Sequence, residues 1–154
     1  MDQGHKKKLE EKECAQKEEC VCFNLRKAAR VITQLYDEAM RPTGFRATQL
    51  TILVTVMRME PVSVTDLAEA TLTDRTTISR NFKPLEKRGL IAIRLGQDRR
   101  SREVVLTSRG REILNRVLPY WKKAQGKVAQ TVGRGRLDQL LRDLSDVLDE
   151  IRKM

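Results

Sequence analysis

The sequence has very few of the side chains from which catalytic and metal sites are built. It contains a single histidine, His5, and three cysteines, which are Cys14, Cys20 and Cys22. One histidine cannot supply both a catalytic base and a set of metal ligands, and a soft-metal site needs more ligands, at better spacing, than these cysteines offer. Nucleophile elbows, phosphate-binding glycine loops and HExxH motifs are also missing. We therefore expect a protein that is not an enzyme and that carries neither a metal nor another cofactor.

Long apolar runs and disulfide patterns are equally scarce. No apolar stretch approaches the ~18–20 residues that a membrane-spanning helix needs, and the first residues, MDQGHKKKLEEKE, lack an apolar segment after their positive charges. An odd number of cysteines without framework spacing is typical of a reducing cytosol. Aromatic residues make up 4% and charged residues 34% of the 154 positions. These features predict a soluble, helix-rich, cytoplasmic chain of one domain with no membrane partner.

The most informative stretch of the sequence, residues 63–110, begins with two helix signals. Ser63 and Asp66 have the spacing of a capping box, in which short side chains bond to free backbone N–H groups at the start of a helix. Thr73 or Asp74 can cap a second helix in the same way. The two predicted helices are short and are joined by a tight polar turn, which is typical of a helix-turn-helix.

The second of these helices carries a clear apolar stripe and is followed by a hairpin. Ile78, Phe82 and Leu85 recur at i, i+4 and i+7, so they share one buried face. Strands are expected over residues 90–95 and 103–107, on either side of an arginine-rich tip. The order of helix, turn, helix, strand, charged tip and strand predicts a winged helix-turn-helix.

The opposite face of the second helix is rich in hydrogen-bond donors of the kinds that reach phosphates and base edges in DNA. Residues at the start of the first short helix and at the hairpin tip are further candidates. The full set of candidate DNA-binding residues is Ser63, Thr65, Arg75, Thr76, Thr77, Ser79, Arg80, Lys83, Asp98, Arg99 and Arg100. Basic residues can simply solvate a helix. However, residues 75–111 hold eleven Lys and Arg against three acids, an excess of +8 in a chain whose net charge is +10. This concentration of charge favours a surface that binds a polyanion.

Before this module the chain predicts a tail and two helices. Residues 1–19 are almost entirely polar and are either disordered or the frayed start of a helix. Residues 20–41 have an apolar stripe of helical period, and a second helix is expected over Ala47–Met59. The residues expected to be buried in that second helix are Leu50, Leu53, Val54 and Met57.

The C-terminal part of the sequence predicts helices over residues 108–153, starting after a capping Thr107. Apolar residues in the last helix are spaced 4, 3, 4 and 3 apart, as in a coiled-coil seam. They are Leu137, Leu141, Leu144, Leu148 and Ile151. With the helix at 20–41, this seam predicts a dimerisation domain attached to a winged helix of residues 47–107; burial within one chain is the alternative. The expected fold is mainly α with a small β-wing, in one domain over residues 20–154.

Three segments resemble the MarR family of transcriptional regulators. They are Asp98-Arg99-Arg100 at the hairpin tip, Leu106-Thr107-x-x-Gly110 at the start of the next helix, and Leu85-Glu86-Lys87-Arg88-Gly89-Leu90-Ile91 at the end of the second short helix. The resemblance extends from about Cys20 to Ile151. It implies a dimeric winged-helix DNA-binding protein, usually a repressor, whose second short helix enters the major groove. It also implies that Arg100, held by Asp98, enters the minor groove, whose negative potential attracts arginine, while Arg99 touches a phosphate.

A dimer of this kind predicts the form of its binding site. Two-fold symmetry would place the two recognition helices about one DNA turn apart, ~34 Å, so the expected partner is a pseudo-palindromic operator in double-stranded DNA. The alternative is a winged-helix module used for protein–protein interaction or for non-specific DNA binding.

One hypothesis for release from DNA is oxidation. Cys22, with Tyr36 fourteen residues later, resembles the organic-hydroperoxide-sensing branch of the family (OhrR), in which a tyrosine hydrogen-bonds to an oxidisable cysteine at a helix start. A thiol at a helix N-terminus has a lowered pKa and reacts more readily with peroxide, and Cys20 could act as a resolving thiol. Two tyrosines of that branch are replaced here, by Arg26 and Ala47. The alternative is that Cys22 is a small buried residue at a dimer interface.

A second hypothesis for release is a small aromatic or anionic effector, which the family resemblance suggests. Such a molecule would bind between the dimerisation helices and the winged module. Arg26, Arg30 and Tyr36 on the first helix, with Trp121 on the long helix after the hairpin, could line this crevice. Trp121 can equally serve as plain core or interface packing.

Overall fold

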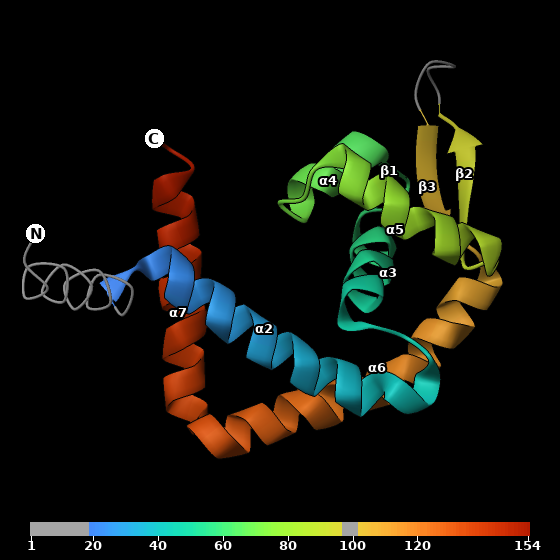
Figure 1. Ribbon diagram of the computed structural model, residues 1–154. Helices are drawn as coiled ribbons and strands as arrows, with labels where there is room; N and C mark the ends of the chain where they lie inside the picture. The colour runs from blue at the N-terminus through green and yellow to red at the C-terminus, as the bar shows by residue number, and fades with distance from the viewer. Residues whose placement is uncertain (1–18, 97–101) are drawn as a thin grey trace, which may run out of the picture. The chain divides into compact units, whose positions relative to one another are not determined.

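The computed structural model describes residues 19–96 and 102–154 (Figure 1). The elements in chain order are α2 (Val21–Met40), η1 (Arg41–Thr43), α3 (Ala47–Met59), β1 (Val62–Ser63), α4 (Val64–Ala70), α5 (Arg75–Lys87), β2 (Ile91–Leu95), β3 (Arg102–Leu106), α6 (Ser108–Val132) and α7 (Arg134–Ile151). The described chain is mainly helical with one small antiparallel sheet, which confirms the predicted fold class. It divides into two compact units, one ending at Leu35 and the other beginning at Tyr36.

In the first unit the structure describes residues 19–35, which include most of α2. The carbonyl of Cys20 accepts hydrogen bonds from the backbone N–H of Asn24 at 3.0 Å and from its side-chain amide at 3.1 Å. The Lys27 ammonium lies 5.4 Å from the centre of the Phe23 ring, within the range of a cation–π contact. Local contacts therefore support this segment of helix, whose start agrees with the prediction to within one residue.

In the second unit, the helix-turn-helix forms as its capping residues predict. The Ser63 hydroxyl accepts a hydrogen bond from the N–H of Asp66 at 3.0 Å and starts α4. Asp74, rather than Thr73, caps α5, with its carboxylate accepting from the N–H of Thr77 at 2.8 Å. Between the two helices Leu72 has a φ of +49°, a left-handed conformation that is strained for a bulky side chain. Local polar bonds thus fix where both helices begin.

The sheet contains one strand more than the sequence predicts. β2 and β3 pair as the expected hairpin, with Ile91 opposite Leu106 and Leu95 opposite Arg102. The additional strand β1 pairs with the other side of β3, so the order is β1-β3-β2. β1 was not predicted because two residues are too short to show the alternation that identifies a strand. It joins the start of α4 to the base of the wing.

The core of the second unit confirms most of the predicted apolar faces. Ile78, Phe82 and Leu85 are all buried, as predicted for α5. In α3 the prediction is correct for Leu50 and Leu53, and Val54 is partly buried. The prediction is wrong for Met57, which is 40% exposed, because the buried stripe continues through Val56, one residue earlier around the helix.

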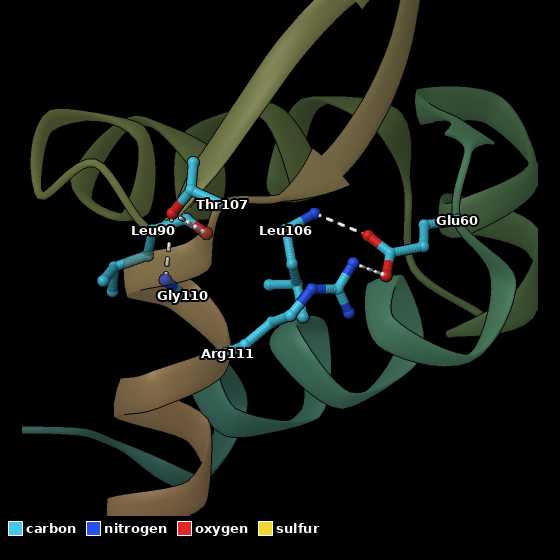
Figure 2. A network of polar contacts seen from close by, with 6 residues as sticks. All are labelled: Glu60, Leu90, Leu106, Thr107, Gly110 and Arg111. Atoms are coloured by element: carbon cyan, nitrogen blue, oxygen red, sulfur yellow. Dashed lines mark hydrogen bonds and ion pairs between the residues drawn. The ribbon is translucent and has the colours of Figure 1, made fainter.

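The junction between α5, the sheet and α6 is built around the backbone of Leu90 (Figure 2). The Leu90 carbonyl accepts a hydrogen bond from the N–H of Thr107 at 3.1 Å. The Thr107 hydroxyl donates chiefly to the Gly89 carbonyl at 2.7 Å and lies 3.3 Å from the Leu90 carbonyl oxygen. The same hydroxyl accepts from the N–H of Gly110 at 2.9 Å and so caps α6. A Cβ at position 110 would overlap the Leu90 carbonyl oxygen and lie 3.0 Å from its carbon. The contact therefore requires glycine, because any side chain would push β2 and α6 apart.

A carboxylate ties the same junction to α3. Glu60 follows α3, and one of its oxygens accepts a hydrogen bond from the N–H of Leu106 at 2.8 Å. Its other oxygen forms an ion pair with Arg111 in the first turn of α6 (Figure 2). The side chain of Glu60 is 14% exposed, so both interactions are partly shielded from water. Three elements are thereby joined at the base of the wing.

Replacement of Gly110 by alanine tests this junction. We expect Gly110→Ala to destabilise the fold by ~1–3 kcal/mol, the range for forcing extra volume into a packed site, as measured by chemical denaturation. Gly126→Ala is the matched control in the same helix, since nothing lies within 4 Å of a Cβ there. That control should be neutral or slightly stabilising, because alanine favours helices over glycine. Equal stability of the two variants would contradict the tight contact at Leu90.

Candidate nucleic-acid interface

The exposed face of α5 presents a row of hydrogen-bond donors. Ile78, Phe82 and Leu85 hold the opposite face in the core, so the positions across the helix from them point to solvent. The predicted residues on the exposed face are Arg75, Thr76, Ser79, Arg80 and Lys83. Their exposure and donor chemistry are what contact with a phosphate backbone or with base edges requires.

Thr77, another of the predicted residues, is partly buried and takes part in the helix cap. Hydrogen bonds from Thr77, chiefly from its side chain and then from its backbone N–H, lower the pKa of Asp74 below its ordinary value. The Asp74 carboxylate therefore stays ionised at neutral pH, at the positive end of the α5 dipole. The contribution of Thr77 in the structure is to orient the start of α5.

A hollow of about 580 Å³ lies between α4, α5 and the sheet. Its lining residues are Ser63, Val64, Thr65, Arg75, Ser79, Phe82, Lys83, Glu86, Ile93 and Arg102. Three of these side chains are cationic and one is a carboxylate, and no ion pair joins that carboxylate to a cation among the described residues. The hollow is therefore a net positive surface formed by segments that are distant in sequence.

This hollow brings together five of the candidate DNA-binding residues, namely Ser63, Thr65, Arg75, Ser79 and Lys83. Thr76 and Arg80 are exposed on α5 but do not line it. The structure adds Arg102, the first residue of β3, which the site prediction missed although it contributed to the local charge excess. The position of Arg102 next to the arginine-rich hairpin tip could have suggested a role in binding. That it lies near α5 in the folded chain could not be predicted from the sequence. The predicted tip residues Asp98, Arg99 and Arg100 lie outside the described residues.

Two of the residues predicted for effector binding meet in the second unit. The ring centres of Tyr36 and Trp121 are 6.4 Å apart, with planes tilted by 48°. The Tyr36 hydroxyl donates a hydrogen bond to the side-chain oxygen of Gln125. Burial raises the pKa of Tyr36, so the phenol remains protonated and keeps its role as a donor. Gln125 was not predicted as part of this cluster.

The other residues of the sensing hypotheses belong to the first unit. Cys22, Arg26 and Arg30 recur every four residues along α2, and all three are exposed. Cys20 and Cys22 are free thiols. Cys22 is therefore accessible in the single chain, and the structure of one chain does not test the alternative in which a dimer buries it.

Two properties of the described ranges 19–96 and 102–154 bear on membranes and metal ions. None of their helices combines the length and apolar character needed to cross a membrane. In the same ranges, no group of three or more His, Cys, Asp or Glu side chains has a geometry that could hold a metal ion.

Comparison with known proteins identifies the family to which these features correspond. A sequence model of the MarR family matches residues 43–101. The crystal structure of the M. tuberculosis transcriptional regulator MosR in complex with DNA has a TM-score of 0.74 and 31% sequence identity, over 86% of this chain and 98% of MosR. The repressor CouR bound to a 23-mer DNA duplex has a TM-score of 0.78 over 85% of this chain and 94% of its own. At 22% identity, its likeness concerns the fold alone.

Relatives identified from sequence point to the same family. The regulator SarZ of Staphylococcus epidermidis is 28% identical over 96 residues, which are 62% of this chain and 65% of SarZ. The match to the Bacillus subtilis regulator YwoH covers 61% of that protein, so the chain spans less than two thirds of either relative. Members of the MarR family are transcriptional regulators and not enzymes. The family match and the similarity to MosR together show that this chain belongs to the MarR family.

Proposed function

We propose that this protein is a cytoplasmic, dimeric repressor that binds a pseudo-palindromic operator in double-stranded DNA. The observation that carries the proposal is the net positive hollow of about 580 Å³, in which donors from α4, α5 and β3 converge. The MosR structure contains DNA, and its likeness to this chain supports the same partner here. In this proposal α5 is the recognition helix and enters the major groove.

The residues divide into two roles by their position. Arg75, Lys83 and Arg102 line the hollow and supply the charges that contact phosphates. Thr76 and Arg80 are exposed on α5 outside it and are the candidates for reading base edges. For the predicted tip residues, the resemblance to the family implies that Arg100, held by Asp98, enters the minor groove and that Arg99 touches a phosphate.

Binding selection from random duplexes supplies the operator and the first test. At ~0.15 M salt we expect a palindromic consensus, and affinity for it should fall with salt by ~0.9 log units per log unit of salt for each phosphate contacted. An absence of any enriched sequence would instead favour non-specific binding. Weak, salt-insensitive binding would favour a module that contacts other proteins.

Charge-removing variants then distinguish the two roles. Arg102→Gln and Lys83→Gln should weaken binding equally on all sequences and each lower the salt slope by ~0.9. Arg80→Ala should cost ~1–3 kcal/mol and relax selectivity at one base pair. Lys122→Gln on α6 is the matched control, because it removes one charge outside the hollow and should leave both quantities unchanged. An equal loss in the control would mean that net charge, rather than this surface, determines binding.

The apolar face of α7 supports the dimer. Leu137 is buried within its own unit, but Leu141, Leu148 and Ile151 are 52%, 48% and 61% exposed. Exposure of a stripe of leucine and isoleucine side chains to water is unfavourable. A second copy of the same helix would cover the stripe symmetrically, as in a coiled coil. We assign this stripe to the interface between two copies of the chain.

The dimer proposal is tested by a charge placed in this seam. Leu148→Glu should lower the solution mass from that of a dimer to that of a monomer at micromolar concentration, because a carboxylate would be buried without a partner. Gln139→Glu adds the same charge on the exposed side of α7 and should leave the dimer intact. Light scattering measures the mass, and circular dichroism checks that helix content is retained. A dimer that survives Leu148→Glu unchanged would remove α7 from the interface.

Release from DNA by a small ligand or an oxidant completes the proposal. The contact between Tyr36 and Trp121 offers an aromatic wall for a ligand, and Cys20 and Cys22 are exposed thiols. For the oxidant route, an organic hydroperoxide should dissociate the protein from its operator, and Cys22→Ser should abolish the response. Tyr36→Phe serves as a comparison that removes one hydroxyl and no thiol. Undiminished release of Cys22→Ser by peroxide would end the oxidant route and leave the ligand route.

A further inference from the structure

A second hollow, of about 350 Å³, lies at the C-terminal end of α5 and away from the candidate DNA-binding residues. It is formed by three segments of the second unit: η1 with the turn before α3, the end of α5, and the first half of α6. Its lining residues are Pro42, Thr43, Phe45, Arg88, Ile113, Arg116, Val117 and Tyr120. None of the candidate DNA-binding or sensing residues is among them.

The contribution of α6 to this hollow is a single helical face. Ile113, Arg116, Val117 and Tyr120 occur at i, i+3, i+4 and i+7, so they project on the same side. Val117 is buried and Ile113 is partly buried, whereas Arg116 and Tyr120 are exposed. The hollow therefore combines the apolar side chains of Ile113 and Val117 with the exposed guanidinium of Arg116 and the exposed phenol of Tyr120.

The charge of the hollow is uncompensated. It contains two guanidinium groups, of Arg88 and Arg116, and no carboxylate among its lining residues. Within the described ranges neither arginine forms an ion pair, in contrast to Arg111, which is paired with Glu60. Two cations that line the same hollow repel each other, and an anion bound between them would remove this cost.

One of the two cations is held in place before any ligand arrives. Arg88 is the C-cap residue of α5, and its guanidinium carbon lies 3.9 Å from the centre of the buried Phe45 ring. Stacking on an aromatic face leaves the edge of the guanidinium, with its N–H donors, free to bind in the ring plane. Thr43 contributes little, because its hydroxyl already bonds to the Met40 carbonyl at 2.6 Å and to the Phe45 N–H at 3.2 Å.

We propose that this hollow binds the phosphate group of a small molecule, through the guanidinium groups of Arg88 and Arg116 and the hydroxyl of Tyr120. Guanidinium forks match the geometry of phosphate oxygens, and two of them balance a dianion. The volume is at the low end of small-molecule sites, which fits inorganic phosphate or a compact phosphate ester. The site does not depend on the DNA-binding proposal, so either can fail without the other.

Thermal unfolding in phosphate tests the site directly. At constant ionic strength and pH, inorganic phosphate should raise the melting temperature of the full chain above its value in chloride, because a ligand of the folded state stabilises it. Isothermal titration with phosphate should give saturable binding, about tenfold weaker in Arg116→Gln, which loses one charge-assisted donor. Arg116 makes no described contact that the fold needs, so this variant should unfold like the parent in chloride.

Two comparisons make the result decisive. Lys122→Gln removes the same charge from another face of α6 and should keep the full response to phosphate. Arg116→Gln should also retain the parent affinity and salt slope for duplex DNA, since the phosphate in this proposal belongs to a free molecule. The proposal is overturned if the melting temperature in phosphate equals that in chloride. It is also overturned if Arg116→Gln keeps the full rise in melting temperature with phosphate. A salt slope for DNA that falls by ~0.9 in Arg116→Gln also overturns it, because the hollow would then contact the DNA backbone.

Discussion

The close approach of the Leu90 carbonyl to Gly110 is the contact on which the arrangement of the winged module depends. Leu90 lies between the end of α5 and β2, and its N–H donates to the carbonyl of Leu85 at 3.0 Å. Its own carbonyl is bound by Thr107, the cap of α6. One peptide group thereby fixes the end of α5, the start of the wing and the start of α6. Because packed interiors do not deform continuously, these three elements are held in one geometry.

Glu60 extends this constraint to α3 and to β3. Its bond to the Leu106 N–H lies at the end of β3, and its ion pair with Arg111 lies in the first turn of α6. An exposed ion pair contributes little to stability, but this carboxylate is largely shielded and also accepts a backbone hydrogen bond. Loss of the carboxylate would leave the partly buried N–H of Leu106 without this partner, which costs more than the loss of an exposed ion pair. Glu60 therefore acts on the position of the wing as well as on stability.

Local signals in the sequence were sufficient to predict most of the fold. Side-chain caps at Ser63 and Thr107 and the apolar stripe of α5 depend on neighbours within about one or two helical turns, so spacing alone reveals them. For the cap of α5, spacing allowed Thr73 or Asp74, and the structure decided for Asp74. β1 could not be predicted, since two residues carry no period. Gly110 was recognised only through the family resemblance, because the requirement for glycine arises from a carbonyl twenty residues away. Met57 was misplaced because position 56 also fits an apolar face, and only packing against the rest of the unit decides between them.

The candidate sites follow the same division. The donors on α5 could be predicted because they share a helix, whereas Arg102 and Gln125 reach their clusters through tertiary contacts. The two hollows use α5 differently: the larger one is lined by its polar face, and the smaller one by its C-cap residue, Arg88. Since Arg88 precedes Leu90 by two residues, a ligand that holds its guanidinium would act close to the peptide group that orients α5. The two proposed sites thus lie on one helix, and any coupling between their ligands would have to be reciprocal.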